Sequence, residues 1–562
     1  MSYKDNASLG GYEDTISGAL SELRDERIVE RMRDGDHTVW GPEPDEISNR
    51  LGWLKSPETS EEALPEILRF AEAVKGEGIE HVLLLGMGGS SLAPEVFGFA
   101  LERKEGYPDL AVLDSTDPEA VLRHAGSLDL SRTLFVVSTK SGGTVETFSF
   151  FKFFYNKVAE IVGAERASSH FVAITDPGSG LQDTAEKYGF RQTFLNDPNI
   201  GGRYSALSFF GVVPAALAGV EVAKLLNSGK DAAREFAGTE GEDNPGAWLG
   251  AVMGELARSA GRDKLTLLAS PALAPFGPWV EQLIAESTGK DGVGILPVAE
   301  EPEGSPEVYG DDRFFVSMRL RSEEPDALLD ELKSQGHPTV EVLLDDPYDL
   351  GGEMFRWEVA TAISGWRLGI NPFDQPNVES AKIQARKMVA EYQEKGELPE
   401  PEPTVEDGGI SVYSSGGAAS VEEALEGFLS QARPGDYVSL QAYLPPSDET
   451  TETLQGLRVR LRERLKLATT LGYGPRFLHS TGQLHKGDGG NGLFIQITSD
   501  PREDAPIPDE AGKPEATLTF GVLEAAQALG DRRALLDVDR RVIRFHLGGD
   551  VSAGLDRLAN SI

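Results

Sequence analysis

The chain of 562 residues contains no cysteine. This absence excludes disulfide bonds, catalysis by a thiol and metal sites built from thiolates, and it fits a protein that works in a reducing compartment. Long hydrophobic runs are also missing, because the longest, residues 209–220, contains Pro214 and is too short to span a bilayer. The first residues show no basic segment followed by an apolar one. We therefore expect a cytoplasmic protein without a membrane span.

Positive charge is scarce, with 53 lysines and arginines against 92 aspartates and glutamates and a formal net charge of −39. A surface of this kind repels nucleic acid and anionic lipid, so we expect neither as a partner. The eight histidines show no HExxH or similar spacing, and we expect no metal site. An anionic metabolite must then be attracted by local cations, which makes basic residues inside apolar segments informative.

Two common nucleotide-binding motifs are absent as well. Gly229-Lys230 and Gly289-Lys290 are each followed by aspartate rather than serine or threonine, so the sequence has no P-loop. The loop GMGGSS that starts at Gly86 has Ser91 where a dinucleotide fingerprint requires its third glycine. We expect neither ATP hydrolysis of the P-loop type nor a nicotinamide cofactor.

The most informative segment that is present covers residues 136–147 and reads VVSTKSGGTVET. An apolar strand leads through a loop of hydroxyls and glycines into a helix that starts near Val145. The unpaired N–H groups of such a helix start carry partial positive charge, and glycines let the backbone approach a ligand. Thr139, Ser141 and Thr144 add hydroxyl donors. The loop is typical of a phosphate site, and the alternative is a plain strand-to-helix turn with Thr144 as N-cap.

Strand-like runs alternate with helical patterns in two successive blocks, which predicts two tandem α/β domains with parallel sheets. A linker rich in Glu, Pro and Gly follows, and the last segment shows a β-α-β-β-α-β order with a strand near residues 477–480. That order predicts a C-terminal α+β domain of the ferredoxin-like type. The expected division is an N-terminal arm 1–60, a first domain 61–240, a second domain 241–396, a linker 397–409 and the C-terminal domain 410–562.

Three further segments place polar or charged side chains where chemistry is possible. Gln282 and Glu286 lie one turn apart on a short predicted helix, where a carboxylate can act as a base or simply face solvent. Arg203 follows two glycines and precedes an apolar helix, a position that suits either a bound anion or a buried salt bridge. Lys382 lies inside a helix that starts near Asn377, and a lone lysine there is otherwise a surface residue.

Together these segments resemble the phosphoglucose isomerase family. Its Gly-Gly-Ser loop, phosphate loop ending in Glu-Thr, Gly-Gly-Arg-Tyr-Ser, Glu-Ser-x-Gly-Lys and Asn-Pro-Phe-Asp-Gln…Lys segments all occur here, in the family's order, between about residues 80 and 395. The segments at 37–40, 48–53 and 479–486 look like the isomerase half of transaldolase/phosphoglucose isomerase fusion proteins. The transaldolase half is absent, since an arm of ~40 residues cannot form a barrel, so a separate transaldolase is a possible partner.

The resemblance implies two tandem doubly wound sugar-isomerase (SIS) domains, a homodimer and no cofactor. It implies interconversion of glucose 6-phosphate and fructose 6-phosphate through a cis-enediol, a reaction of glycolysis and gluconeogenesis. Glu286 matches the family's base, Arg203 the arginine that steadies the enediolate, and Lys382 the ring-opening lysine. The other matched substrate and phosphate ligands are Gly89, Ser90, Thr139, Lys140 through its backbone, Ser141, Thr144, Gln282 and Gln375.

One departure from the family concerns ring opening. The family uses a histidine for which the matching segment here, 351–355, offers Glu353 instead. Either Glu353 takes this work, or Lys382 does it alone, or a histidine comes from the C-terminal domain, with His485 as the candidate. His485 can also be an ordinary loop histidine. A histidine suits the step because its reference pKa of about 6.5 allows proton exchange near neutrality.

Competing functions share most of these residues. A dual phosphoglucose/phosphomannose isomerase would have almost the same site. A non-catalytic hexose-phosphate sensor with sugar-isomerase domains needs the phosphate loop but not the base, so the presence of Glu286, Arg203 and Lys382 favours an enzyme. An isomerase that also transfers an amino group is disfavoured by the lack of a cysteine nucleophile.

Overall fold

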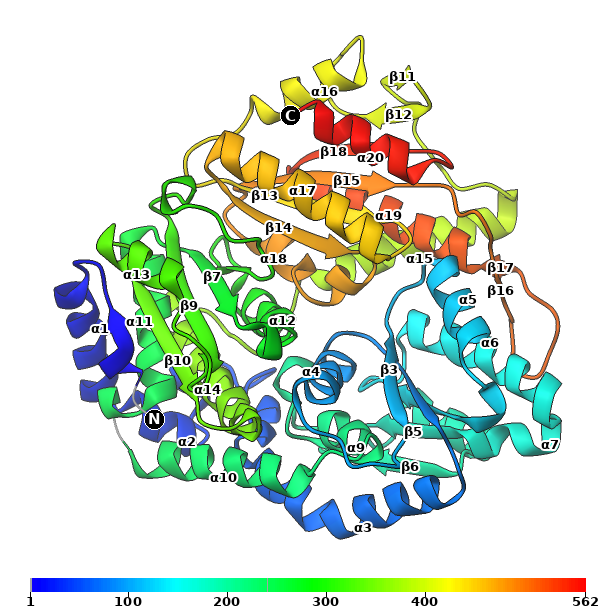
Figure 1. The fold of residues 1–562 in the computed structure, drawn as a ribbon, viewed down its shortest axis with the longest axis horizontal. Helices are drawn as coiled ribbons and strands as arrows, with labels where there is room; N and C mark the ends of the chain where they lie inside the picture. The colour runs from blue at the N-terminus through cyan, green and yellow to red at the C-terminus, as the bar shows by residue number, and fades with distance from the viewer. Residues whose placement is uncertain (1–2, 240) are drawn as a thin grey trace.

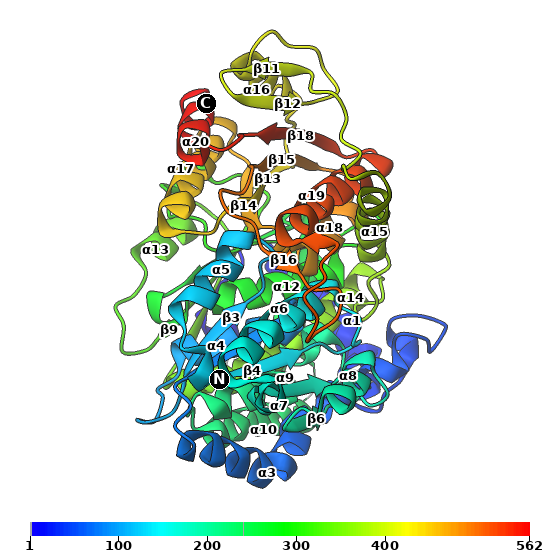
Figure 2. The same ribbon diagram turned by 90° about the vertical axis from the view of Figure 1, so that its right-hand side faces the viewer.

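The computed structural model describes residues 3–239 and 241–562 and arranges them around three main sheets (Figure 1). The first sheet lies at the right of Figure 1 in blue and cyan, the second at the left in green, and the third across the top in orange and red. Figure 2 also places the third sheet above the other two. Within the described residues, no helix is both long enough and apolar enough to cross a membrane.

The first sheet has five parallel strands in the order β3-β2-β4-β5-β6. Because β2 lies between β3 and β4, the strand order reverses there, and the loops after β2 and β4 meet at the carboxyl edge of the sheet. The strands are β2 (His81–Gly86), β3 (Asp109–Leu113), β4 (Thr133–Ser138), β5 (Phe171–Thr175) and β6 (Gln192–Leu195). The accompanying helices are α3 (Ser56–Gly76), α4 (Leu92–Ala100), α5 (Pro118–Ser127), α6 (Val145–Val162), α7 (Ala164–Ala167), α8 (Gly180–Tyr188) and α9 (Phe209–Leu217).

The second sheet has the order β1-β10-β9-β7-β8 and is parallel except at one edge. That edge is β1, a strand of the N-terminal arm that pairs antiparallel with β10, so the arm completes this sheet. The strands are β1 (Ala7–Ser8), β7 (Lys264–Ala269), β8 (Leu296–Val298), β9 (Arg313–Leu320) and β10 (Thr339–Leu344). The helices of the arm and this unit are α1 (Glu13–Asp25), α2 (Ile28–Arg33), α10 (Val222–Gly238), α11 (Pro245–Ala260), α12 (Phe276–Thr288), α13 (Ala327–Ser334) and α14 (Leu350–Leu368).

The third sheet corrects the ferredoxin-like prediction. Its order is β11-β12-β18-β15-β13-β14, and the four strands β14, β13, β15 and β18 are all parallel. The strands are β11 (Val405–Asp407), β12 (Ile410–Tyr413), β13 (Tyr437–Tyr443), β14 (Ala468–Tyr473), β15 (Gly492–Thr498) and β18 (Arg541–His546). The helices are α16 (Val421–Leu429), α17 (Asp448–Leu465), α18 (Gly482–Gly487), α19 (Phe520–Asp537) and α20 (Val551–Asn560).

One segment accounts for the wrong prediction of a ferredoxin-like sheet. The predicted strand near residues 477–480 is a 3-10 helix, Arg476–His479, and the true strand β14 comes earlier, directly after α17. Within this sheet, the connections from β13 to β14, from β14 to β15 and from β15 to β18 each contain a helix, and strands joined by helical crossovers run parallel. The C-terminal unit is thus a third α/β unit rather than an antiparallel α+β one.

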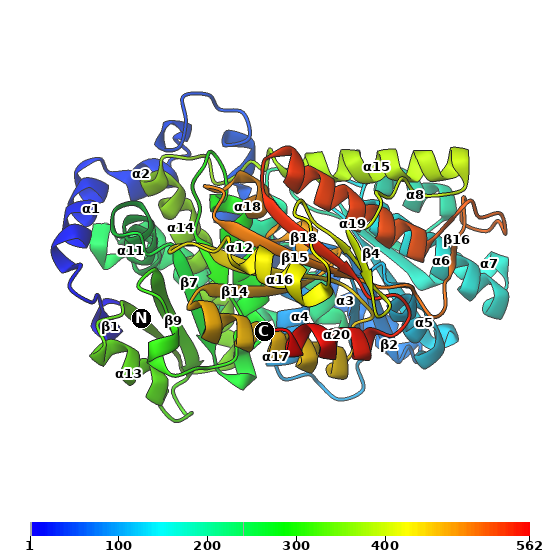
Figure 3. The same ribbon diagram turned by 90° about the horizontal axis from the view of Figure 1, so that it is seen from above.

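Helix α15 (Val378–Lys395) ties the C-terminal unit to the rest of the chain. It packs along α19, and a Cβ added at Gly530 of α19 would lie only 2.7 Å from the backbone nitrogen of Ala385. Figure 3 shows the two helices side by side. Another contact is a small hairpin of β16 (Pro506–Ile507) and β17 (Leu518–Thr519), which packs beside α6. The C-terminal unit therefore touches both the phosphate-loop helix and the Lys382 helix.

Candidate active site

The loop after β4 folds as a tight turn in which hydroxyl groups converge. Thr139 Oγ1 and Thr144 Oγ1 lie 2.8 Å apart, and Ser141 Oγ accepts from the N–H two residues on at 3.3 Å. Thr144 is the N-cap of α6, but its side chain makes no capping bond. Gly142 has φ +63°, and a Cβ there would lie 2.6 Å from the nitrogen of Leu181. The loop therefore presents hydroxyls and a helix start to a cavity, as an anion site requires.

Lys140, inside the same loop, directs its ammonium away from this turn. The group forms an ion pair with Asp176 and donates to the carbonyl oxygen of Pro198 at 3.1 Å. The loop is further fixed by Thr175, whose Oγ1 donates to the carbonyl oxygen of Thr139 at 2.8 Å. The ammonium of Lys140 is thus engaged by protein partners, and binding of a ligand by its backbone stays a prediction.

The loop after β2 lies against the segment that carries Arg203. A Cβ added at Gly89 would lie 2.0 Å from the carbonyl oxygen of Gly202, so only glycine permits this contact. Ser90, the next residue, is buried. The structure thus brings two glycine loops into contact, although they are more than a hundred residues apart in the sequence.

Arg203 is buried and fully engaged at the junction of the first two units. Its Nε donates to Ser287 Oγ at 2.7 Å and its Nη1 to Gln375 Oε1 at 2.5 Å. Its Nη2 donates to the carbonyl oxygens of Pro372 and Asp374 at 2.7 and 2.9 Å. These bonds hold the guanidinium in one orientation, as an anion-stabilising group in a site must be held.

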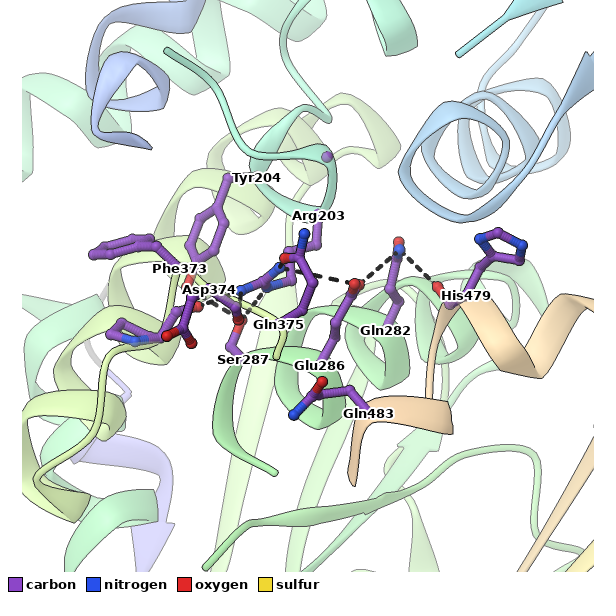
Figure 4. Close-up of polar contacts among 12 residues, drawn as sticks. Arg203, Tyr204, Gln282, Glu286, Ser287, Phe373, Asp374, Gln375, His479 and Gln483 are labelled. Carbon is purple, nitrogen blue, oxygen red and sulfur yellow. Dashed lines mark hydrogen bonds and ion pairs between the residues drawn. The ribbon is translucent and has the colours of Figure 1, made fainter. Parts of the chain in front are cut away.

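Glu286 faces this guanidinium (Figure 4). Its Oε1 lies 3.8 Å from Arg203 Nη1, and its side chain is 13% exposed, so a bound molecule can reach it. One helical turn earlier, Gln282 Nε2 donates to Glu286 Oε2 at 3.1 Å and to the carbonyl oxygen of His479 at 2.8 Å. The structure therefore brings the Gln282–Glu286 pair, which the sequence placed on one helix, next to Arg203 from a different segment.

Lys290 is a further buried cation that the sequence reasoning did not assign. Its Nζ donates to the carbonyl oxygen of Asp374 at 2.5 Å and to Oδ1 of the same residue at 2.8 Å. Burial lowers the pKa of Lys290 to about 8, the nearby charge of Arg203 acts in the same direction, and Asp374 opposes both. Lys290 and Arg203 thus both bind the loop that contains Asp374. Lys290 is the last residue of the segment ESTGK, which starts with Glu286.

A cavity of about 400 Å³ lies beside the phosphate loop and contains Lys382. Its lining includes Ser141, Gly143 and Thr144 from the loop. The Lys382 side chain is 46% exposed, and its Nζ donates to Glu379 Oε1 at 3.1 Å, one turn away on the same helix. Lys382 is therefore a cation that faces the phosphate loop across the cavity.

The C-terminal unit contributes a histidine to this cavity. His479, at the end of the 3-10 helix that follows β14, has its Nε2 3.0 Å from Glu146 Oε1. Glu146 lies in the first turn of α6 and also accepts from Gln527 Nε2 at 2.8 Å. We call His479, Glu146, Gln282 and Gln527 the His479 corner. Burial raises the pKa of Glu146, but the charge and hydrogen bond of His479 outweigh it, so the pKa lies below its ordinary value.

Comparison with known proteins identifies the family. The family model described as phosphoglucose isomerase matches residues 69–313. A glucose-6-phosphate isomerase of Rubrobacter xylanophilus is 30% identical over 415 residues, which cover 65% of this chain and 94% of that protein. The chain belongs to the phosphoglucose isomerase family. Another member, the glucose-6-phosphate isomerase of Carboxydothermus hydrogenoformans, is 27% identical, with 67% of this chain and 89% of that protein covered.

Two solved structures share the fold of this chain. A hypothetical protein of Thermus thermophilus is 26% identical and superimposes with a TM-score of 0.57, covering 68% of this chain and all of its own. A glucose-6-phosphate isomerase of Chlamydia trachomatis shares the fold with a TM-score of 0.59 at 19% identity, covering 71% of this chain and 91% of its own. The prediction of paired parallel SIS sheets is confirmed.

The suggestion that His485 supplies the phosphoglucose isomerase histidine does not agree with its position. His485 is 1% exposed and packs between Tyr437 and Phe494 inside the C-terminal unit. Its Nδ1 lies 3.3 Å from Gln441 Nε2, and burial holds its pKa well below the ordinary value. The histidine that reaches the cavity is His479, six residues earlier.

The position of Glu353 does not agree with a role in ring opening either. Its carboxylate is fully buried, accepts from Tyr3 OH at 2.5 Å and from Arg356 Nη1 at 2.8 Å. Burial raises the pKa of Glu353 in spite of the Arg356 charge. Both oxygens are thus occupied, one by an ion pair within α14 and the other by the hydrogen bond from Tyr3 of the N-terminal arm, and neither is free for a sugar.

The sequence contained part of the signal for His479 and none for Gln527. Residues 479–486 were recognised as similar to a family segment, but choosing between two histidines requires knowing which one precedes α18 and which lies within it. Glu146 belongs to the Glu-Thr end of the phosphate loop. Among the described residues, no group of three or more histidines, aspartates or glutamates is arranged to hold a metal ion.

Proposed function

We propose that this chain interconverts glucose 6-phosphate and fructose 6-phosphate by moving one proton between C1 and C2. The observation that carries the proposal is the 3.8 Å approach of Glu286 Oε1 to Arg203 Nη1, with Gln282 bonded both to Glu286 and to the backbone of His479, a residue of the cavity beside the phosphate loop (Figure 4). A carboxylate next to a fixed guanidinium suits removal of a proton from carbon, because the oxygen that becomes negative lies beside a positive charge.

The phosphate group binds at the loop after β4. Thr139, Ser141 and Thr144 supply hydroxyls, the start of α6 supplies partly positive N–H groups, and Gly89 and Ser90 supply the neighbouring loop. Lys382 provides a cation across the cavity. In a chain of net charge −39, such a local group of donors attracts a dianion that the rest of the surface repels.

The proton transfer uses Glu286. In the direction from glucose 6-phosphate, Glu286 takes the proton from C2 of the open-chain sugar, and the electron pair moves toward the carbonyl oxygen at C1. Arg203 stabilises the resulting enediolate, whose hydroxyl proton passes from O2 to O1, and Glu286 returns its proton to C1. Gln282 and Gln375 hold Glu286 and Arg203 through bonds of 3.1 and 2.5 Å. Substrate and product are isomers, so the chemistry requires no redox cofactor.

Ring opening precedes this transfer, and we assign its proton to His479. As the C1–O5 bond breaks, the Nδ1–H of the protonated imidazole passes to O5, and the proton lost by the C1 hydroxyl returns through water to Nδ1. Glu146 accepts the Nε2–H of His479, which leaves Nδ1 as the exchanging nitrogen. Lys382, in the same cavity, assists by its charge.

A coupled assay tests the proposal, with fructose 6-phosphate supplied and glucose 6-phosphate detected by a dehydrogenase. Turnover in heavy water with deuterium incorporated at C2 is the expected result. Binding of fructose 6-phosphate without turnover would contradict the proposal and indicate a sensor. Mannose 6-phosphate, run in parallel, reveals whether the enzyme has dual specificity.

Assembly and location form the finer part of the proposal. A homodimer in the cytoplasm follows from the family resemblance and the composition, as does a possible separate transaldolase partner. Sedimentation of the purified chain tests the dimer, and co-purification from the source cells tests the transaldolase. The candidate site itself is formed by residues of a single chain, so activity per chain should not fall on dilution.

A further inference from the structure

We propose that Gln527, in the C-terminal unit, is a positioning residue for ring opening that acts through Glu146 on His479. Gln527 lies on α19, is 4% exposed and contacts the first unit at two points. Its Nε2 donates to Glu146 Oε1 at 2.8 Å, and its Oε1 accepts from Thr116 Oγ1 at 2.7 Å. Because ring opening is part of the isomerase reaction, the inference rests on the proposed function.

The two contacts fix the orientation of the Gln527 amide. The Glu146 carboxylate only accepts, so the amide nitrogen must face it, and the buried Thr116 hydroxyl then donates to the amide oxygen. The reversed amide would place its oxygen against the Glu146 carboxylate, and two acceptors would then face each other without a proton. Thr116 and Gln527 thus form a polarised pair that ends on one oxygen of Glu146.

The same oxygen of Glu146 binds the histidine. Oε1 accepts from Gln527 Nε2 and from His479 Nε2, at 2.8 and 3.0 Å. Glu146 is 4% exposed, so a carboxylate with only one donor would be poorly satisfied there and free to rotate toward the cavity. The bond to Gln527 holds Glu146 in the rotamer that meets His479, and Glu146 in turn holds the imidazole through its Nε2–H, so that Nδ1 is the nitrogen left to exchange a proton.

The proposed role concerns ring opening alone. Gln527 touches neither Glu286 nor Arg203 in the contacts of the described residues, and its path to the reaction runs only through Glu146 and His479. A substrate that is already open does not need His479. The effect of Gln527 should therefore appear with cyclic sugar phosphate and vanish with a sugar that cannot form a ring.

The test uses two variants and two substrates. Gln527→Met keeps the volume of the side chain but removes both hydrogen bonds, while Thr116→Val removes only the bond that orients the amide. The cyclic substrate is glucose 6-phosphate, and the open-chain one is its 4,5-dideoxy analogue, which lacks the hydroxyls that close five- and six-membered rings. Gln384→Met is the matched control, because this glutamine of α15 bonds Asp537 near the far end of α19.

We expect Gln527→Met to lower kcat/KM for the cyclic substrate about 10- to 100-fold, the loss typical of one hydrogen bond to a charged group. Thr116→Val should lower it by a smaller factor, and Gln384→Met should leave it unchanged. Turnover of the open-chain analogue should stay within about twofold in all three variants, which also shows that they are folded.

Two results would overturn the inference while leaving the isomerase function in place. One is equal loss on cyclic and open-chain substrates, which would make Gln527 a structural residue. The other is normal activity of Gln527→Met on both. Failure of the proposed function itself is seen separately, as a wild-type protein that turns over neither substrate.

Discussion

The phosphate loop and the His479 corner face one cavity but are built in different ways. The loop comes from a single segment between β4 and α6, and its hydroxyls bond to groups within five residues. The corner takes Glu146 from the first unit, Gln282 from the second, and His479 and Gln527 from the third. Phosphate binding therefore depends on local structure, whereas ring opening depends on the docking of three units.

The docking of the C-terminal unit is specific on both sides of His479. Before it, Arg476 forms ion pairs with Glu95 and with Asp114, at 3.1 Å in the second case. After it, Gln483 Nε2 donates to Asn377 Oδ1 at 2.7 Å and to the carbonyl oxygen of Gly289 at 2.9 Å. The segment is thus anchored to the first unit by charge and to the second by an amide, which fixes the histidine between them.

The largest effect on activity is expected at Glu286, which belongs neither to the phosphate loop nor to the His479 corner. Glu286→Gln should lower kcat by ~10²–10⁴ with KM changed only a few-fold, because a general base is lost and phosphate binding is not. Loss of deuterium exchange at C2 should accompany the fall, on cyclic and open-chain substrates alike. Near-normal turnover of this variant would place the proton carrier elsewhere.

A smaller effect, on binding, is expected from the loop. Ser141→Ala combined with Thr144→Ala should raise KM about 10- to 100-fold and leave kcat nearly constant, since the hydroxyls bind the phosphate equally in substrate and transition state. Steady-state kinetics with both substrates measure this. A double variant with unchanged KM and reduced kcat would move the phosphate away from the loop and remove the contrast with the corner.

The smallest expected effect concerns how the C-terminal segment docks. Ser480 Oγ donates to Glu281 Oε1 at 3.2 Å, and burial raises the pKa of Glu281 to about 7. The folded protein then holds a proton between pH 4.5 and 7 that the unfolded chain has released, so stability falls as the pH rises through this window. Glu281→Gln should remove that dependence.

Melting curves at pH 5 and pH 8 measure this change. Because the side chain is partly exposed, we expect the Glu281→Gln variant to gain about 1–3 °C over wild type at pH 8 and nothing at pH 5. A lower melting temperature of the variant at pH 8 would contradict the expectation, because it would show that the ionised Glu281 is stabilised by the nearby arginines Arg458 and Arg476.

The same contrast explains what the sequence could and could not predict. The phosphate loop can be predicted from the sequence because its geometry follows from a strand-to-helix turn. The Gln282–Glu286 pair can be predicted because residues four apart lie on one face of a helix. The choice between His479 and His485 cannot be predicted from the sequence, because it depends on how α18 packs between distant units. The parallel third sheet was missed for a related reason: a short apolar segment, Arg476–His479, forms a 3-10 helix instead of a strand.

The most direct test of the account is the substrate dependence of His479→Ala. We expect kcat/KM of this variant to fall about 10²-fold on glucose 6-phosphate and turnover of the 4,5-dideoxy open-chain analogue to stay near normal, because only ring opening needs the imidazole. His485→Phe, which keeps an aromatic ring beside Tyr437 and Phe494, should behave as wild type on both. An active His479→Ala enzyme beside an inactive His485→Phe enzyme, or equal loss of both substrates in His479→Ala, would contradict it.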